Sequence, residues 1–509
     1  MRSSTACLIG VLSSALLAQA ASPDVGLFPA SGDVGSPKIG GSAAYNPISE
    51  DYALSAAGSN MWAQRDEFQF VSRRLTGDFI LQARVQFAGK GVDPHRKAGL
   101  VIRAGTDADA PYVDAVVHGD GLTSLQFRRT KGAATEEKRS EITGADVLQL
   151  ERRGSRFIMS AAKSGDPYTT TELADMTLPD EVLAGLALCS HNPDVVERAV
   201  FSNVRVIRPA AENFRPYRDY IGSVLELLDV STGARRVLQR SEDPFEAPNW
   251  TRDGGSLIYN TSGTAPDKRG RLVRYDLASG HTTTIDTATN TRNNNDHVLS
   301  FDGTMLAISD QSQPGGSAVY TVPLAGGTPK RLTANTPSYG HSWSPDGKTI
   351  LYTGGRGTDT PEFDIFAMNA DGTGAERNLT HNKGLDDGPE YAPDGESIYF
   401  NSVRSGSMQI WRMKPDGSDP EQVTNDARNN WFPHISPDGQ WIAFISFPKE
   451  VDPADHPYYK QVMLRVMPVA GGAPRTIAYV YGGQGTINVP SWSPDSRMLA
   501  FVSNSGSLK

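Results

Sequence analysis

The chain has 509 residues, a formal net charge of −9, 50 glycines and 33 prolines. This length is too great for a single hydrophobic core and indicates two or more domains. The acidic balance argues against nucleic acids and anionic membrane surfaces as partners, because both are bound by basic patches. Short alternating segments between glycine- and proline-rich turns predict an all-β protein.

Residues 1–20 have the pattern of a secretory signal peptide. Arg2 precedes an apolar run from about residue 7 to residue 17, and Ala18-Gln19-Ala20 provides small residues for cleavage. The run is shorter than the roughly 20 apolar residues of a membrane-spanning helix, and no later segment approaches that length. We therefore expect a secreted or periplasmic protein without a transmembrane segment.

Residues 21–210 contain no repeat and are expected to form a β-sandwich. Alternating segments separated by turns predict strands at 68–72, 78–87, 98–103, 112–117, 124–128, 147–152 and 156–160. The phrases Lys-Ala-Gly-Leu-Val-Ile-Arg at 97–103 and Gly-Leu-Ala-Leu-Cys-Ser-His-Asn at 185–192 resemble a concanavalin-A-like jelly roll. That resemblance implies a carbohydrate site on the concave sheet. The candidate contacts are Trp62, Arg103, Gln126 and Arg128, with a packed tryptophan and solvated strand faces as the alternative.

Residues 211–509 repeat one phrase six times. Its forms include Pro-Asn-Trp-Thr-Arg-Asp-Gly at 248–254, His-Ser-Trp-Ser-Pro-Asp-Gly at 341–347 and Pro-Ser-Trp-Ser-Pro-Asp-Ser at 490–496. Successive aspartates of the phrase stand 44 to 57 residues apart. Each phrase is a turn between two alternating strands, and two further strands follow it. Four strands repeated at this spacing predict the blades of a β-propeller.

The two ends of the repeat region complete one blade. The sixth repeat stops after its second strand, at 501–503, and the missing outer pair is found ahead of the first repeat, at 223–227 and 235–238. Pairing these segments closes the ring without an open edge, so we predict six blades. Residues 223–505 resemble the propeller of the Tol-Pal protein TolB, whose Ser-Pro-Asp-Gly repeats alternate with strands like those seen here.

Polar residues gather where the inner strands enter the propeller axis. The position five residues before the repeat aspartate is proline in most repeats but histidine in two, at His297 and His341. The next position contains Glu390 and His434 in adjacent repeats. Equivalent positions of adjacent blades are neighbours around the axis, so each of these pairs is expected to lie close together.

The predicted site comprises the side chains that converge on this funnel. Imidazole and carboxylate groups serve as acids and bases, amides bind hydroxyls, and aromatic faces stack on sugar rings. The expected catalytic residues are His297, His341, Asp387, Glu390 and His434. The expected substrate-binding residues are Asn295, Tyr339, Asn430, Trp431, Gln484 and Asn488.

A second resemblance concerns a metal. His297, His341, His434 and Gln484 are similar to the funnel residues of oligogalacturonate lyases, propeller enzymes that use histidines and a glutamine with a divalent ion. The resemblance implies a Ca²⁺ or Mn²⁺ site. The chain lacks the closely spaced histidine pair of those enzymes.

These observations lead to two hypotheses from different functional classes. The first is an exported glycan-binding protein that acts on an oligosaccharide or polysaccharide as a glycoside hydrolase or polysaccharide lyase. The alternative, implied by the resemblance to TolB, is a non-catalytic envelope scaffold whose funnel binds a peptide or protein partner.

Overall fold

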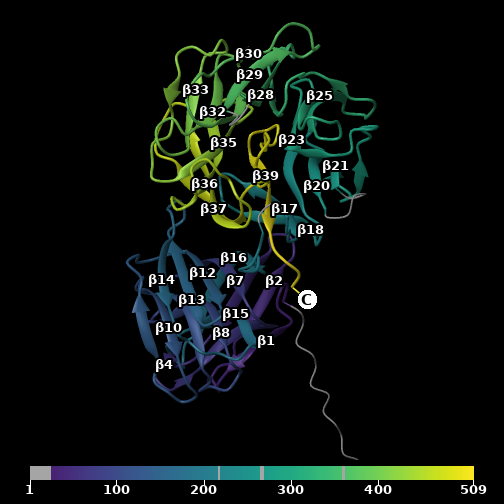
Figure 1. Ribbon diagram of the computed structural model, residues 1–509. Helices are drawn as coiled ribbons and strands as arrows, with labels where there is room; N and C mark the ends of the chain where they lie inside the picture. The colour runs from purple at the N-terminus through teal and green to yellow at the C-terminus, as the bar shows by residue number, and fades with distance from the viewer. Residues whose placement is uncertain (1–24, 216–217, 264–268, 358–361, 509) are drawn as a thin grey trace, which may run out of the picture.

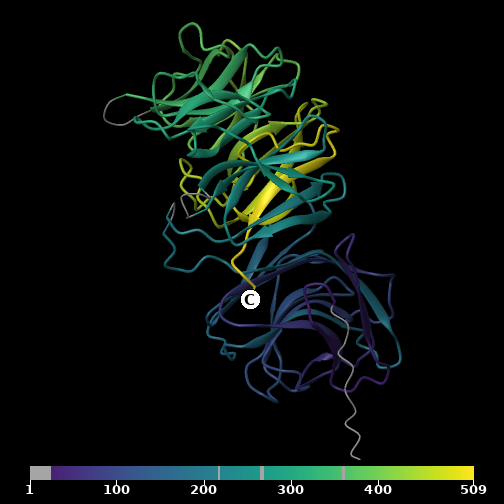
Figure 2. The same ribbon diagram turned by 90° about the vertical axis from the view of Figure 1, so that its right-hand side faces the viewer.

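The computed structural model describes residues 25–215, 218–263, 269–357 and 362–508. An N-terminal sandwich of two sheets is followed by a six-bladed propeller (Figure 1). The view turned by 90° shows the C-terminal end of the chain lying beside the sandwich (Figure 2). The predicted signal peptide lies outside the described residues. In the described ranges, no helix is long and apolar enough to cross a membrane.

The sandwich consists of two seven-stranded antiparallel sheets. Side chains that alternate along the strands, such as Leu81, Ala83 and Val85, fill one large apolar core between the sheets. The first sheet contains, in spatial order, β1 (Ala30–Val34), β6 (Phe68–Leu75), β15 (Val182–Cys189), β8 (Lys97–Arg103), β9 (Tyr112–His118), β10 (Thr123–Arg128) and β11 (Glu136–Arg139). The second contains β14 (Thr169–Leu173), β13 (Arg156–Ala162), β12 (Val147–Arg153), β7 (Phe79–Phe87), β16 (Glu197–Ile207), β3 (Asp51–Ala56) and β2 (Ser42–Asn46).

Five blades of the propeller are four-stranded meanders. Blade one contains β19 (Phe245–Trp250), β20 (Ser256–Ser262), β21 (Arg269–Asp276) and β22 (Thr282–Thr284), and blade two contains β23 (Asn293–Leu299), β24 (Met305–Asp310), β25 (Ala318–Pro323) and β26 (Lys330–Arg331). Blade three contains β27 (Ser338–Trp343), β28 (Thr349–Arg356), β29 (Glu362–Asn369) and β30 (Arg377–Asn378). Blade four contains β31 (Asp386–Tyr391), β32 (Ile398–Ser402), β33 (Gln409–Met413) and β34 (Glu421–Gln422), and blade five contains β35 (Asn429–Ile435), β36 (Trp441–Phe447), β37 (Lys460–Pro468) and β38 (Arg475–Gly482).

The repeated phrase forms the hairpin between the first two strands of a blade. In blade three, Ser344 donates to Oδ1 of Asp346 at 2.6 Å and accepts from the backbone N–H of Thr349 at 2.9 Å. Gly347 has φ +70°, which favours glycine. The turn therefore satisfies its own polar groups, which explains why the phrase recurs.

The sixth blade joins the two ends of the propeller segment, as predicted. β17 (Ser223–Asp229) pairs on one side with β18 (Arg235–Ser241) and on the other with β39 (Met498–Asn504). An isolated bridge between Trp492 and Leu499 stands where the other blades have an inner strand. Figure 1 shows β39 beside β17 at the centre of the molecule.

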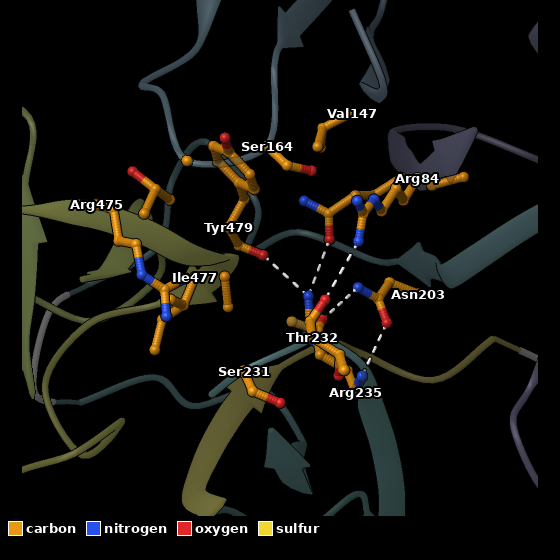
Figure 3. A pocket seen from close by; sticks show the side chains of 16 residues that line it. Arg84, Val147, Ser164, Asn203, Ser231, Thr232, Arg235, Arg475, Ile477 and Tyr479 are labelled. Atoms are coloured by element: carbon orange, nitrogen blue, oxygen red, sulfur yellow. Dashed lines mark hydrogen bonds between the residues drawn. The ribbon is translucent and has the colours of Figure 1, made fainter. Parts of the chain in front are cut away.

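A buried ion network joins the sandwich to this closing blade. Glu226 of β17 is fully buried and accepts from Arg205 of β16 at 2.7 Å and from Arg235 of β18 at 2.6 Å. Arg235 also donates to Oε1 of Gln82. It donates to the carbonyl of Tyr479 as well, as Figure 3 shows. Although burial alone would raise the pKa of Glu226, the two guanidinium groups hold it well below its ordinary value. This network of Glu226, Arg205 and Arg235, here called the joint, thus connects the sandwich and the propeller through buried ion pairs.

Candidate functional site

The funnel cavity is a hollow of about 510 Å³ at the end of the axis where the inner strands begin. Its wall comes from β23, β27, β31 and β35 together with two loops near residues 454–456 and 484–488. The lining residues are mostly amides, aromatics and ionisable groups: Asn294, Asn295, Asp296, Gln311, Tyr339, His341, Thr353, Phe363, Leu385, Asp387, Phe432, Ala454, His456, Gln484 and Asn488.

His341 and Asp387 form the ionisable centre of this cavity. Nε2 of His341 lies 3.3 Å from Oδ1 of Asp387 and 4.0 Å from Oδ1 of Asp296. Asp387 also accepts from the hydroxyl of Thr353 at 2.7 Å. Burial alone would lower the pKa of His341 and raise that of Asp387, but their mutual attraction raises the histidine pKa and lowers the aspartate pKa. The electrostatics of the pair therefore favour an imidazolium–carboxylate ion pair over the neutral forms.

In the same cavity, the pKa of Asp296 is raised, whereas that of Asp387 is lowered. Burial raises the pKa of Asp296 to about 7, and the negative charges of Asp387 and Glu246 add to the rise while His341 opposes it. Asp296 is 7% exposed. The funnel cavity thus contains Asp387, whose lowered pKa favours the ionised form, and Asp296, whose carboxyl group titrates near neutral pH.

The lengths of two β-bulges explain why His341 lines the funnel cavity and His297 does not. In blade three, one extra residue stands between Gly340 and Ser342 opposite consecutive residues of β28, and this residue is His341. Blade two contains two extra residues between Asn293 and His297, so His297 pairs directly with Ile308. His297 is fully buried, and its Nε2 lies 3.3 Å from the carbonyl of Ile258. The predicted proximity of His297 to His341 does not lead to a shared site, because only His341 lines the cavity.

Glu390 and His434 contact each other as predicted, but they lie in the wall of the channel. Nδ1 of His434 is 2.6 Å from Oε2 of Glu390, and its Nε2 is 2.5 Å from the carbonyl of Ile487. Oε1 of Glu390 accepts from the backbone N–H of Ile435 at 3.0 Å. Both residues are occupied by these structural contacts, and neither lines the funnel cavity.

Some of the predicted substrate-binding residues line the funnel cavity, and the others are buried elsewhere in the propeller. Asn295, Tyr339, Gln484 and Asn488 line the funnel cavity. Asn430 is fully buried in a network with Gln409 and Ser446, and Trp431 is fully buried in the core of blade five. The structure thus brings together six of the eleven predicted residues: His341, Asp387, Asn295, Tyr339, Gln484 and Asn488.

Phe432 presents an aromatic face to the cavity from a strained backbone position. Its φ is +53°, a region that bulky side chains rarely adopt. Its backbone N–H donates to Oδ1 of Asn401 at 3.0 Å, and its ring is nearly parallel to that of His341, with centroids 6.4 Å apart. Backbone strain of this kind concentrates at functional sites.

A second cavity of about 220 Å³ continues from the first towards blade one. Both are lined by Asn294, Asn295, Gln311 and Gln484. At its base Glu246 accepts from the hydroxyl of Tyr458 at 3.0 Å, from Ser262 and from Nδ2 of Asn295 at 3.4 Å. Burial raises the pKa of Glu246 despite these neutral donors.

Comparisons with known proteins agree with this architecture. The TolB beta propeller domain family matches residues 358–508. An uncharacterized protein of Agrobacterium fabrum is 44% identical over 281 residues, which are 55% of this chain and 92% of that protein. The chain belongs to the TolB β-propeller family.

Solved structures extend the comparison. A structure described as "putative TolB from Agrobacterium tumefaciens" has 43% sequence identity and a TM-score of 0.53, and the match covers 57% of this chain and all of that one. A Tol-Pal system protein TolB from Francisella tularensis is 26% identical over 220 residues, 41% of this chain and 47% of that protein. An oligogalacturonate lyase in complex with manganese has 13% identity and a TM-score of 0.37, with 57% of this chain and 99% of that one covered.

The metal site implied by the lyase resemblance does not fit this member of the TolB family. Of the four residues that would form it, only His341 and Gln484 line the funnel cavity. His297 faces the carbonyl of Ile258, and His434 lies between Glu390 and the carbonyl of Ile487. No group of three or more His, Cys, Asp or Glu side chains within the described ranges is arranged to hold a metal.

Two of the four sugar contacts predicted for the sandwich, Arg103 and Arg128, are not accessible to a ligand. Arg103 and Arg128 are fully buried and pair with Asp66 at 2.9 and 2.7 Å. Asp66 belongs to a hairpin of β4 (Met61–Trp62) and β5 (Arg65–Asp66). Because that hairpin supplies their partner, these strand residues neither meet solvent nor reach a ligand.

The predicted site did not include Asp296 or His456, although both line the cavity, whereas Phe432 was expected, with Trp431 and Tyr339, to offer a flat face to a sugar ring. Asp296 and Phe432 stand in the segments that enter inner strands, and each lies next to a predicted residue or one removed. The polar and aromatic composition of these segments could have indicated their residues as lining residues. The length of the bulges, which decides how the side chains are oriented, cannot be predicted from the sequence. His456 comes from the loop between β36 and β37, outside the repeated phrase.

Proposed function

We propose that this protein is an exported, non-catalytic scaffold of the TolB type whose funnel binds an extended segment of a partner protein. The observation that carries the proposal is the lining of the funnel cavity. Five amide side chains line it: Asn294, Asn295, Gln311, Gln484 and Asn488. Each amide offers donors and an acceptor, which matches the alternating N–H and C=O groups of a peptide backbone.

The arrangement of the ionisable residues supports binding over catalysis. Three of the five residues expected to be catalytic, His297, Glu390 and His434, do not line the cavity. The family relationship supports the same choice, because the chain belongs to the TolB β-propeller family.

A selection experiment with displayed random peptides tests this function. The immobilised full-length chain is expected to enrich peptides that bind the wild type but not Tyr339→Ala or Asn488→Ala. Arg252→Ala, at the opposite mouth of the channel, is the matched control and should retain binding. Enrichment of peptides that bind all three variants equally would contradict the funnel as the site.

A carbohydrate-active enzyme is the second candidate, and one observation favours it. Asp296 and Asp387 line one cavity with pKa values displaced in opposite directions. A protonated acid beside an ionised carboxylate is the arrangement that glycoside hydrolysis requires. Release of reducing ends from a polysaccharide panel at pH 5–8, lost in both Asp296→Asn and Asp387→Asn, would establish this function in place of the scaffold.

A further inference from the structure

Several buried carboxylates elsewhere among the described residues have cationic partners. Asp66 pairs with two arginines, Glu197 pairs with Arg96 at 2.6 Å, and Glu226 pairs with Arg205 and Arg235. Removing a charge from water costs several kcal/mol, and a close opposite charge offsets that cost. A buried carboxylate that lacks such a partner is therefore a place where an external cation can bind.

One such carboxylate, Asp296, lines the funnel cavity, and another, Glu246, lines the second cavity that continues from it. The ion-pair partner of Asp296 among the described residues is His341, 4.0 Å away and closer to Asp387, at 3.3 Å. Asp296 and Asp387 thus share one imidazole. Glu246 is 7% exposed, and its side-chain hydrogen-bond partners among the described residues, Tyr458, Ser262, Asn295 and Asn260, are all neutral. No lysine or arginine is among the described residues that line the funnel cavity, whereas Arg269 and Arg292 line the second cavity, which contains Glu246.

The cavity also suits a flat cation. The aromatic residues Phe432, held at φ +53°, and Tyr339 line the same cavity as Asp296. A guanidinium group stacks on aromatic faces and donates two parallel hydrogen bonds to a carboxylate, whereas an ammonium group is a compact point charge.

We propose that an arginine side chain of the partner segment occupies the funnel cavity, with its guanidinium group paired to Asp296 and stacked on Phe432. The inference rests on the proposed function, since it names the residue that the bound segment presents. Asn295 and Asn488, which line the same cavity, bind the backbone on either side of that arginine.

Binding of an arginine side chain at Asp296 is coupled to the release of a proton from that carboxyl group. The groups that face Asp296 are His341, Asp387, Glu246 and Tyr339. Burial raises the pKa of Asp296 to about 7, so a large fraction of the free protein is protonated there at neutral pH. Pairing with guanidinium requires the ionised form, so binding releases a proton to the buffer. Affinity for arginine should therefore increase from pH 6 to pH 8.

Isothermal titration of the full-length chain with matched pentapeptides tests the inference. The probes are acetyl-Gly-Gly-X-Gly-Gly-amide with X as arginine, its neutral isostere citrulline, or lysine. The arginine peptide is expected to bind at least about tenfold tighter than the citrulline peptide and more tightly than the lysine peptide. Asp296→Asn should remove the preference over citrulline and the dependence on pH, and its melting temperature shows whether it is folded.

The outcomes separate this inference from the proposed function. Equal binding of the arginine and citrulline peptides, or a preference that survives in Asp296→Asn, overturns the arginine assignment and leaves peptide binding in place. Equal binding of lysine and arginine overturns the stacked guanidinium. Binding of oligosaccharides with no peptide bound at millimolar concentration overturns both proposals.

Discussion

The two histidines at the start of blades two and three have different surroundings because β-bulges of different length place their backbones differently. His341 is the extra residue of a one-residue bulge and faces the axis, whereas His297 follows a two-residue bulge and is buried. The residue types at both positions are the same, so the sequence alone predicts two equivalent histidines. Bulge length depends on cross-strand pairing, which a single sequence does not show.

Asp296 provides a test of this electrostatic description. A carboxyl group whose pKa is higher in the folded chain, at about 7, than in the unfolded chain holds more protons when folded, so its contribution to stability falls as pH rises from about 4 to 7. Asp296→Asn should therefore stabilise the fold at pH 8 by on the order of 2–4 kcal/mol, and by less at pH 5. Urea unfolding at the two pH values measures the difference.

The same substitution at Asp302 is the control. Hydrogen bonds from Ser300 and Thr304 lower the pKa of this turn residue, so Asp302→Asn should destabilise the fold, and more at pH 8 than at low pH. A stabilisation by Asp296→Asn that is equal at pH 5 and pH 8 would show that its carboxyl group does not titrate near neutrality.

At the scale of elements, the repeat and its closure were predictable from sequence. The Ser-Pro-Asp-Gly turn uses local hydrogen bonds, as Ser344 and Asp346 show, and local chemistry can be read from neighbouring residues. Completion of the ring by β17 and β39 followed from counting the strands at each end. The hairpin that supplies Asp66 to the sandwich was missed, because it lies between strands and Asp66 pairs with Arg128, which is 62 positions away.

The closing strand is expected to be essential for stability. Phe501 of β39 is fully buried between the ends of the ring. Phe501→Ala should cost about 3–5 kcal/mol, because it removes a large buried side chain and leaves a cavity. Phe301→Ala is the matched control, since Phe301 is only partly buried and should cost less. Equal losses in denaturant unfolding would show that closure by β39 contributes no special stability.

For the whole molecule, the joint predicts that the sandwich and the propeller unfold together. Glu226 connects Arg205 of the sandwich to Arg235 of the propeller while fully buried. Glu226→Gln leaves two buried guanidinium groups without their shared carboxylate and should cost about 3–5 kcal/mol. Calorimetry of the wild type should show one transition, and the variant should melt at lower temperature or in two steps. Two transitions in the wild type would show that the joint does not couple the domains.

The central claim is that the funnel binds an extended partner segment, and hydrogen–deuterium exchange tests it most directly. Exchange is compared for the full-length chain alone and saturated with a peptide from the display selection. The account predicts added protection at the starts of β23, β27, β31 and β35 and in the loop at 484–488, with little change in the sandwich. Protection confined to the concave sheet of the sandwich, to the joint or to the opposite mouth of the channel would contradict it.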